Sequence, residues 1–292
     1  MADTTSIPVV EFAPTQTFGG DFELIELDSL YERSDQLDID PFSPHRINFH
    51  HLVYIAEGRG AHTIDFHAQP FRAGSFIFAN RHQVNAFDRD HRPRGYILLF
   101  TQDFVDSIRT HIRFAAFNTG FHSESFAPVL TVEGRLKASC ETLLLELSKE
   151  RDEQGDGTVT KLLFSTLMVK LHRYRPASTD GLISEHDQQR FARFMELVQS
   201  QFSTSKDASG YAESLGLSYK TLNKLCKQMT QKTPKQLIDA HIILEAKRRL
   251  AIERIKVSQL AYQFGFDDVS NFVKYFKKHA GFTPSQFQRE IA

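Results

Sequence analysis

Two stretches near the C-terminus carry amide, hydroxyl and ammonium side chains at the spacing of one helix face. The two sets are Lys220, Asn223, Lys224 and Lys227, and Ser270, Asn271, Lys274 and Lys278. Residues three or four positions apart lie on the same face of a helix. In the major groove of DNA, amide and hydroxyl groups read base edges, while ammonium groups neutralise phosphates or contact guanine. These residue types therefore favour binding of double-stranded DNA.

The same two stretches carry an apolar stripe on another helix face. The stripes are Leu222, Leu225, Cys226 and Met229, and Val269, Phe272, Val273 and Phe276. A helix with one apolar and one cationic face buries the first and exposes the second. One such helix is equally well an ordinary solvated helix, but two of them at matched positions of a repeat favour a pair of recognition helices.

Each of these predicted helices follows the same kind of turn. Gly216-Leu217-Ser218 and Gly265-Phe266-Asp267 both join glycine, an apolar residue and a capping residue, and their glycines are 49 positions apart. Glycine permits the positive φ at which helices end, and we expect the third residue of each turn to cap the next helix. Thr233-Pro234 and Thr283-Pro284 follow the two helices in the same way. The segment is therefore predicted to hold two helix-turn-helix units.

A helix predicted from Pro234 to about Ile252 joins the two units. The 18 residues from Pro234 to about Ala251 have a length of roughly 27 Å, at about 1.5 Å per residue. Successive major grooves on one side of B-DNA lie about 34 Å apart. A stiff connection of this length would hold two recognition helices near that spacing, so that one chain contacts two adjacent grooves.

The charge of the chain changes sign between its two halves. Residues 1–184 hold 18 Lys and Arg against 25 Asp and Glu, whereas residues 185–292 hold 17 against 11. The net charges are thus −7 and +6, and a basic half favours a polyanionic partner. Residues 176–186 are polar and contain breakers, so we expect a linker there and a DNA-binding domain over 187–292.

Residues 1–175 combine strands with a helical pair. Short β-branched and aromatic segments recur between turn residues over about 20–105, which predicts a small barrel or a double-sheet sandwich. Leucines at spacings of three and four over about 133–175 predict two helices. Such a hairpin forms a dimer face or only covers the sheet. The expected fold class is α+β with two domains, a β-barrel with a helical hairpin and an all-α double helix-turn-helix.

The C-terminal domain resembles the AraC/XylS family of transcriptional regulators. The resemblance lies in Ala212 to Leu222, in Glu245-Ala-Lys-Arg-Arg-Leu250 and, most specifically, in Gly265 to Pro284. It implies two helix-turn-helix subdomains joined by a long helix, and RNA polymerase as a partner. It also implies base contacts from Lys220, Asn223 and Lys224 in the first subdomain and from Val269, Ser270, Asn271 and Lys274 in the second. Gln231 stands where the family often has glycine, so we expect strain at that helix end.

The N-terminal domain is similar, more loosely, to the cupin-like effector and dimerisation domain of the same family. The likeness lies in residues 49–58, 71–78 and 82–87. It implies a homodimer and a small-molecule effector inside the barrel. A phenylalanine-lined pocket with cationic groups suits an aromatic or carboxylate effector, for which the candidate residues are Arg46, His51 and His82. A ligand-independent regulator whose barrel only dimerises is the alternative.

The sequence offers little support for catalysis or a metal. Metal-dependent cupins use closely spaced histidines, but His50 and His51 are adjacent and would point to opposite faces of a strand. Asn85 stands where a later histidine is needed. We expect no enzyme activity, metal or cofactor. A metal-dependent cupin enzyme fused to a DNA-binding tail and a module that binds an acidic protein are the remaining alternatives.

The chain shows no membrane segment and no secretory signal. Its two cysteines, Cys140 and Cys226, are too few for a disulfide scaffold. We therefore expect a cytoplasmic protein with no membrane partner.

Overall fold

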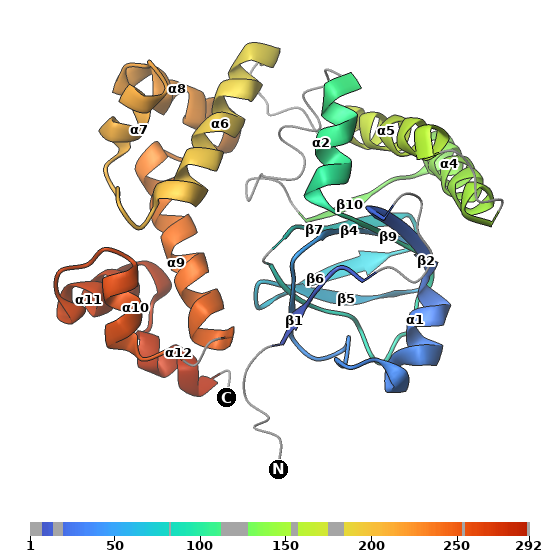
Figure 1. The fold of residues 1–292 in the computed structure, drawn as a ribbon, viewed down its shortest axis with the longest axis horizontal. Coiled ribbons are helices and arrows are strands. Elements are labelled where there is room, and N and C mark those ends of the chain that lie inside the picture. The colour runs from blue at the N-terminus through green and yellow to red at the C-terminus, as the bar shows by residue number, and fades with distance from the viewer. Residues whose placement is uncertain are drawn as a thin grey trace. The chain divides into compact units, whose positions relative to one another are not determined.

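In a computed structural model, the protein folds into two compact units (Figure 1). The structure describes residues 8–13, 20–81, 83–111, 128–152, 157–174, 184–252 and 255–290. Pro8–Pro176 form one unit, and Ala177–Ala292 belong to the other. No helix in the described ranges combines the length and the apolar character that crossing a membrane requires.

The N-terminal unit contains two five-stranded sheets. Sheet A has the order β1 (Val9–Val10), β3 (His45–Ile47), β8 (Val84–Ala86), β5 (Arg59–Ile64) and β6 (His67–Arg72). Sheet B has the order β10 (Val129–Thr131), β7 (Ser75–Ala79), β4 (His50–Glu57), β9 (Arg94–Phe100) and β2 (Phe22–Glu26). Helix α1 (Leu27–Arg33) and the 3-10 turn η1 (Ser34–Gln36) follow β2.

The two sheets are not closed into one barrel. The expectation of a β-barrel is thereby corrected, and the double-sheet arrangement is the one observed. Among the described strands, no ladder pairs a strand of sheet A with a strand of sheet B. Gly58 between β4 and β5 has φ +100°, and Gly74 between β6 and β7 has φ +86°. At these glycines the chain turns sharply and passes from one sheet to the other. A hairpin within one sheet would instead have paired the two strands that it joins.

The strands of sheet B bury side chains on both faces. Val53 and Ile55 of β4 face sheet A and join a core that contains Ile47 and Ile64. The alternate residue Leu52 faces the other side and packs in the core that holds the helical hairpin. Alternation along one strand therefore supplies two cores, which is why these strands are apolar almost throughout.

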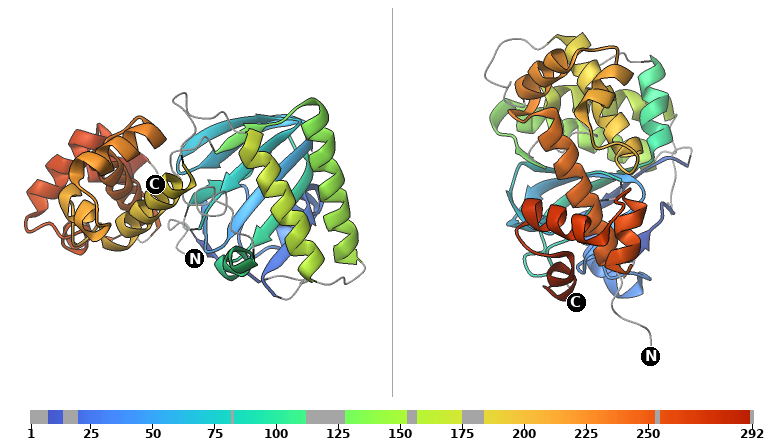
Figure 2. Two further views of the ribbon diagram at one scale, coloured as in Figure 1. Left: turned by 90° about the horizontal axis from the view of Figure 1, so that it is seen from above. Right: turned by 90° about the vertical axis from the view of Figure 1, so that its left-hand side faces the viewer.

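Two helices cover the outer face of sheet B. They are α4 (Gly134–Asp152) and α5 (Gly157–Tyr174), and Figure 2 shows them as green helices lying across the strands. Helix α2 (Gln102–His111) adds Phe104 to the same core. Tyr54 donates a hydrogen bond from its hydroxyl to Glu141 Oε1 at 2.7 Å, which ties β4 to α4. The helical hairpin that the leucine spacing predicted is thus confirmed as part of the fold.

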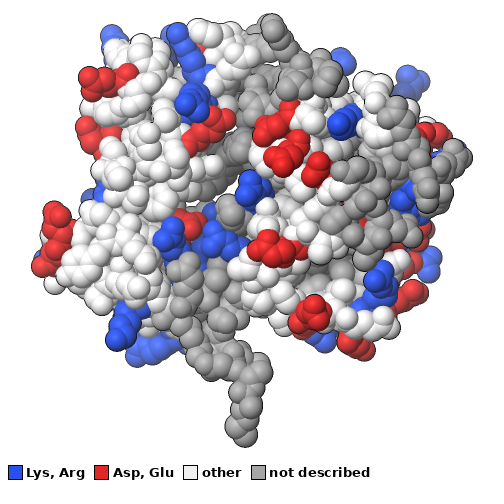
Figure 3. All heavy atoms as spheres, in the orientation of Figure 1, with Lys and Arg blue, Asp and Glu red and all other residues white. Residues whose placement is uncertain are grey.

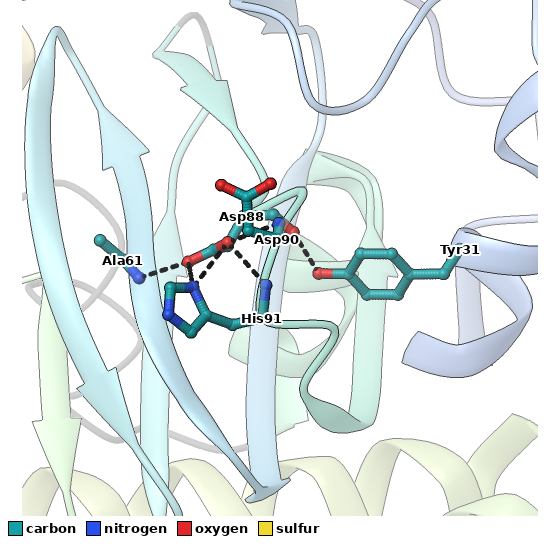
Figure 4. A network of polar contacts seen from close by, with 5 residues as sticks. All are labelled: Tyr31, Ala61, Asp88, Asp90 and His91. Atoms are coloured by element: carbon teal, nitrogen blue, oxygen red, sulfur yellow. Dashed lines mark hydrogen bonds and ion pairs between the residues drawn. The ribbon is translucent and has the colours of Figure 1, made fainter.

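A loop after β8 is fixed by the carboxylate and backbone of Asp88 (Figure 4). The Ala61 amide donates to Asp88 Oδ2 at 2.9 Å, and the Tyr31 hydroxyl donates to the Asp88 carbonyl at 2.6 Å. His91 Nδ1 lies 2.9 Å from Asp88 Oδ2. Burial acts to raise the pKa of Asp88, but the hydrogen bonds from Ala61, His91 and Asp90 outweigh it and lower the pKa below its ordinary value. The loop is therefore held to β5 and α1.

The C-terminal unit is helical throughout its described elements. They are α6 (Glu185–Gln201), α7 (Ala208–Ser214), α8 (Tyr219–Thr230), α9 (Pro234–Ile252), α10 (Val257–Gln263), α11 (Val269–Ala280) and α12 (Pro284–Glu290). Helix α9 runs through the unit, with α6 to α8 packed at one part of it and α10 to α12 at the other (Figure 1). The double helix-turn-helix fold is confirmed.

The predicted linker over 176–186 only partly falls on residues that the structure describes. Residues 176–183 lie outside the described ranges. Glu185 and His186 belong to α6, because Ser184 accepts a hydrogen bond from the Asp187 amide and begins the helix there.

Candidate functional site

Helix α8 separates its apolar and polar residues as the sequence predicts. Ser218 caps the helix, because its Oγ accepts a hydrogen bond from the Thr221 amide at 3.1 Å. Leu222, Leu225 and Cys226 are buried. Burial raises the pKa of the Cys226 thiol to about 12, so this cysteine is a core residue rather than a reactive one.

The polar face of α8 is exposed at its lysines but not at its amide oxygen. Lys220, Lys224 and Lys227 are all exposed, whereas Asn223 is half-buried. Asn223 Oδ1 is buried and has no hydrogen-bond partner among the described residues. Reading a base edge with that oxygen therefore requires the Asn223 side chain to rotate.

Helix α11 begins one residue later than the repeat predicts. Asp268, not Asp267, caps it by accepting hydrogen bonds at Oδ1 from the Ser270 and Asn271 amides. Those hydrogen bonds lower the pKa of the Asp268 carboxyl. The capping prediction for Asp267 was wrong because the second turn contains one residue more than the first.

The polar face of α11 is open to solvent. Phe272 and Phe276 are buried, and Val269 is half-buried. The exposed residues of the predicted set are Ser270, Asn271, Lys274 and Lys278. The exposed residues follow the 3.6-residue period, so their side chains project from one side of the helix.

The two recognition helices end in the same backbone conformation. Gln231 caps the end of α8 at φ +61°, and Gly281 caps the end of α11 at φ +88°. Each cap amide donates to the carbonyl four residues earlier, from Gln231 to Lys227 and from Gly281 to Lys277. Glutamine in place of glycine at position 231 therefore leaves the backbone conformation of the helix end unchanged. The positive φ strains Gln231, because this residue carries a side chain.

A buried carboxylate on α9 holds α11 in place. Asp239 Oδ1 accepts hydrogen bonds from the Tyr275 hydroxyl at 2.6 Å and from Lys235 Nζ at 2.5 Å. His279 Nε2 lies 3.7 Å from Asp239 Oδ2. Burial and the hydrogen bond to Asp239 together raise the pKa of Tyr275, so its hydroxyl remains a donor. The orientation of α11 is thus tied to the central helix by polar contacts as well as by packing.

The surplus of basic residues in the C-terminal unit is not gathered on one visible face. In Figure 3, Lys and Arg side chains of this unit are interspersed with Asp and Glu. On this face, the cationic groups relevant to DNA are identified by the helix face that they occupy.

The candidate effector residue His51 lies between the two sheets. It shares the inward parity of Val53 and Ile55 on β4. Its ring centroid is 5.5 Å from that of His62 on β5 and 5.7 Å from that of Phe87. Two further polar residues of sheet A, His45 and Asn85, pair across β3 and β8. We call His45, His51, His62 and Asn85 the interior polar cluster.

The interior polar cluster is buried and incompletely hydrogen-bonded. His51 Nε2, His62 Nε2 and Asn85 Oδ1 have no hydrogen-bond partner among the described residues. Burial lowers the pKa of His62 to about 3, and burial followed by the charge of His62 lowers the pKa of His51 well below its ordinary value. Both rings are therefore neutral at pH 7 and present unused donor or acceptor nitrogens.

Arg46 and His51, two of the three predicted effector residues, lie on different sides of sheet A. Arg46 alternates with His45 and Ile47 on β3, so it lies on the opposite face of sheet A from the interior polar cluster. His82 lies outside the described residues. Sequence reasoning missed His62 altogether, although it precedes the inward-facing Ile64 by two positions and that parity identifies it.

No metal centre is formed by the described residues. No group of three or more histidine, cysteine, aspartate or glutamate side chains within them has the arrangement of a metal site. His50 faces away from His51, stacks on Phe100 and lies with its Nε2 3.1 Å from Gln102 Oε1.

Comparison with protein families divides the chain in the same two parts. The family described as "AraC-like ligand binding domain" matches residues 34–168. The family described as "Helix-turn-helix domain" matches residues 211–290. The first match includes β3 to β10, α4 and most of α5 but leaves out β1 and β2. The second match includes both turns, α8 and α11.

The chain is similar to a curated transcriptional activator and to two solved structures. The HTH-type transcriptional activator RhaS of Yersinia pestis is 21% identical over 256 residues, covering 86% of this chain and 90% of the relative. ToxT of Vibrio cholerae, solved with a bound unsaturated fatty acid, is 17% identical, with a TM-score of 0.45, and covers 94% of this chain and 97% of its own. The C-terminal domain of the response regulator yesN of Fusobacterium nucleatum is 26% identical, with a TM-score of 0.30, over 32% of this chain and 93% of its own.

Proposed function

Because the chain belongs to the AraC/XylS family of transcriptional regulators, we propose that α8 and α11 enter two successive major grooves of one operator. The observation that carries this proposal is the pair of two-faced helices packed on one central helix. Helix α9 has 19 residues, which corresponds to about 28 Å. With the offsets of α8 and α11 added, this length suits the spacing of adjacent grooves.

The residues of each polar face have separate roles in this proposal. The base-reading groups are Asn223, Ser270 and Asn271, and the cationic groups are Lys220, Lys224, Lys227, Lys274 and Lys278. Lys224 and Lys274 lie nearest the middle of their helices, so we assign them to guanine or to the phosphates beside it. The regulator acts in the cytoplasm by binding rather than by catalysis, and it affects transcription through RNA polymerase.

The N-terminal unit provides effector control in this proposal. The unpaired nitrogens of His51 and His62 and the unpaired oxygen of Asn85 face the space between the sheets, where a ligand would satisfy them. A ligand bound there would favour one arrangement of the molecule over others. We leave Arg46 out of this proposed site, because it lies on the other face of sheet A.

The helical hairpin is our candidate for the homodimer interface. Leu145 of α4 and Leu162 of α5 are 50% and 55% exposed, although leucine side chains are ordinarily buried. Apolar residues on the outer face of a helical pair gain most by packing against a second copy. Dimerisation would place four recognition helices on two tandem or opposed half-sites.

Selection from random DNA tests the proposal. The purified chain should enrich a motif made of two short boxes about 10 base pairs apart. On the selected site, Lys224→Ala and Lys274→Ala should each weaken binding by about 1–3 kcal/mol and lower the salt dependence of binding. Fluorescence anisotropy at several salt concentrations measures both effects.

A matched control is Lys161→Ala, which removes a lysine from α5 in the N-terminal unit and should leave DNA affinity unchanged. A chain that enriches no motif would contradict DNA recognition. A motif with a single box, unaffected by one of the two lysine variants, would contradict the two-groove arrangement.

A further inference from the structure

The loop between α6 and α7 touches both helix-turn-helix units. It comprises residues 202–207, which we call the α6–α7 loop. In Figure 1 it extends from the group of α6 to α8 toward the group of α10 and α11. Its contacts lie at the turn Phe264 to Phe266, which is the turn of the second unit. The loop is thus a second connection between the units, in addition to α9.

Lys206 makes the polar part of this connection. Its Nζ donates a hydrogen bond to the Gly265 carbonyl at 3.0 Å and lies 4.4 Å from the centre of the Phe266 ring. Burial, followed by the charge of Lys235, lowers the pKa of Lys206. The ammonium group is therefore partly withdrawn from water and used inside the protein, unlike the exposed lysines of α8 and α11.

The backbone of the loop also presses on the second turn. A Cβ atom at Gly265 would lie 2.0 Å from the Ser203 carbonyl oxygen, so no side chain fits there. Gly216, at the matching position of the first turn, has nothing within 4 Å of such a Cβ. The two glycines look alike in the repeat, but only the second one admits the α6–α7 loop.

The other side of the α6–α7 loop contacts the first helix-turn-helix unit and α9. The Tyr211 hydroxyl donates to the Ser205 carbonyl at 2.9 Å, and Tyr211 itself is buried in α7. The ring of Phe202 lies 5.2 Å from that of His241 on α9 and 5.0 Å from that of Phe264. The loop therefore contacts the first unit, the central helix and the second turn at once.

We infer that the α6–α7 loop fixes the separation of α8 and α11, and that Lys206 is a positioning residue for the spacing of the two DNA boxes. A single helix between two units permits bending and twisting about its axis, and a second attachment point restrains both motions. The restraint means that one box-to-box spacing is bound best. This inference rests on the proposed binding of two adjacent grooves.

Selection from random DNA, followed by sequencing, tests the inference with the full chain. The wild type should enrich two boxes at one dominant spacing. Lys206→Ala should enrich the same two boxes, with the preference for that spacing over spacings one base pair longer or shorter reduced by about 5-fold. Lys206→Arg keeps a cation and a donor at this position and should restore much of the preference.

Two comparisons separate positioning from other roles. Lys227→Ala removes an exposed lysine of the proposed DNA face, so it should weaken binding without broadening the spacing. Circular dichroism and thermal unfolding check that Lys206→Ala remains folded, as expected for a partly exposed side chain.

The inference is overturned if Lys206→Ala selects the wild-type distribution of spacings. It is also overturned if the variant lowers the salt dependence of binding without broadening the spacing, because Lys206 is then a phosphate contact. A wild-type chain that enriches no bipartite motif would instead contradict the two-groove proposal itself.

Discussion

The buried histidines between the sheets make the stability of the N-terminal unit depend on pH. The pKa of His62 falls to about 3 and that of His51 falls well below 6.5 in the folded chain, mainly because both are buried. Below pH 6.5 the unfolded chain therefore binds protons that the folded chain does not. The stability of the folded chain is therefore unaffected by these histidines above pH 6.5, and it decreases as the pH falls below 6.5.

Between pH 7.5 and 5.5 we expect the free energy of unfolding to fall by about 1.4 kcal/mol on account of His62, and by a further amount on account of His51. His62→Gln should remove the part of this loss that is due to His62, whereas His67→Gln, at an exposed position on β6, should leave the loss unchanged. Urea unfolding followed by circular dichroism at pH 5.5 and 7.5 measures the difference. Equal pH dependence in the wild type and in His62→Gln would contradict the buried, neutral state of this ring.

Single residues were the least predictable scale from sequence. The parity that places His51 inside also places Arg46 outside, but parity is defined only once the inward side of β3 is known. The cap of α11 was assigned one residue early, because the repeat does not reveal that its second turn is longer. The first case concerns a strand, in which neighbouring side chains point to opposite faces. The second concerns a turn that is one residue longer than its counterpart in the repeat.

The ends of the recognition helices offer a test at the scale of the element. Gln231 adopts φ +61° at the end of α8, where a side chain is strained and glycine is not. Gln231→Gly should raise the free energy of unfolding by about 0.5–1 kcal/mol, after allowing for the greater freedom of glycine in the unfolded chain. Thermal unfolding of the full chain measures this effect.

Gly281→Ala is the matched substitution at the end of α11. A Cβ there has nothing within 4 Å, so the variant isolates the cost of positive φ and should lower stability by about 1 kcal/mol. If Gln231→Gly were destabilising while Gly281→Ala had no effect, backbone strain would not govern these helix ends.

Helices were predicted more reliably than sheets. The long helix was expected from Pro234 to about Ile252, and α9 has these bounds, because proline marks its start and a continuous apolar pattern marks its course. The strands were recognisable, but whether they close a barrel depends on long-range pairing. The turns at Gly58 and Gly74 decide that pairing, and their φ values are not encoded in any local pattern.

At the scale of the whole molecule, the exposed leucines of the hairpin predict self-association. Leu145→Glu and Leu162→Glu should raise the monomer fraction, because a charge buried against a second apolar face is costly. Leu37→Glu is a suitable control, since Leu37 is 41% exposed outside the hairpin. Sedimentation velocity at several concentrations measures the fraction. A monomeric wild type, or a dimer that neither hairpin variant affects, would contradict this interface.

The division into a sheet-containing unit and a helical unit was predictable because composition, charge and period all change near the same place in the chain. The contact of the α6–α7 loop with the second turn was not, since Lys206 and Gly265 are 59 positions apart and share no motif. Tertiary contacts of this kind determine how two recognition helices are placed, and they follow from packing rather than from periodicity.

Methylation interference at guanine N7 on the selected operator tests the central claim most directly, because this atom faces the major groove. The account predicts two clusters of interfering guanines about one helical turn apart on one side of the duplex. Lys224→Ala should abolish the interference at one cluster and Lys274→Ala at the other. A single cluster, or two clusters that the same lysine variant removes together, would contradict the binding of two adjacent grooves by α8 and α11.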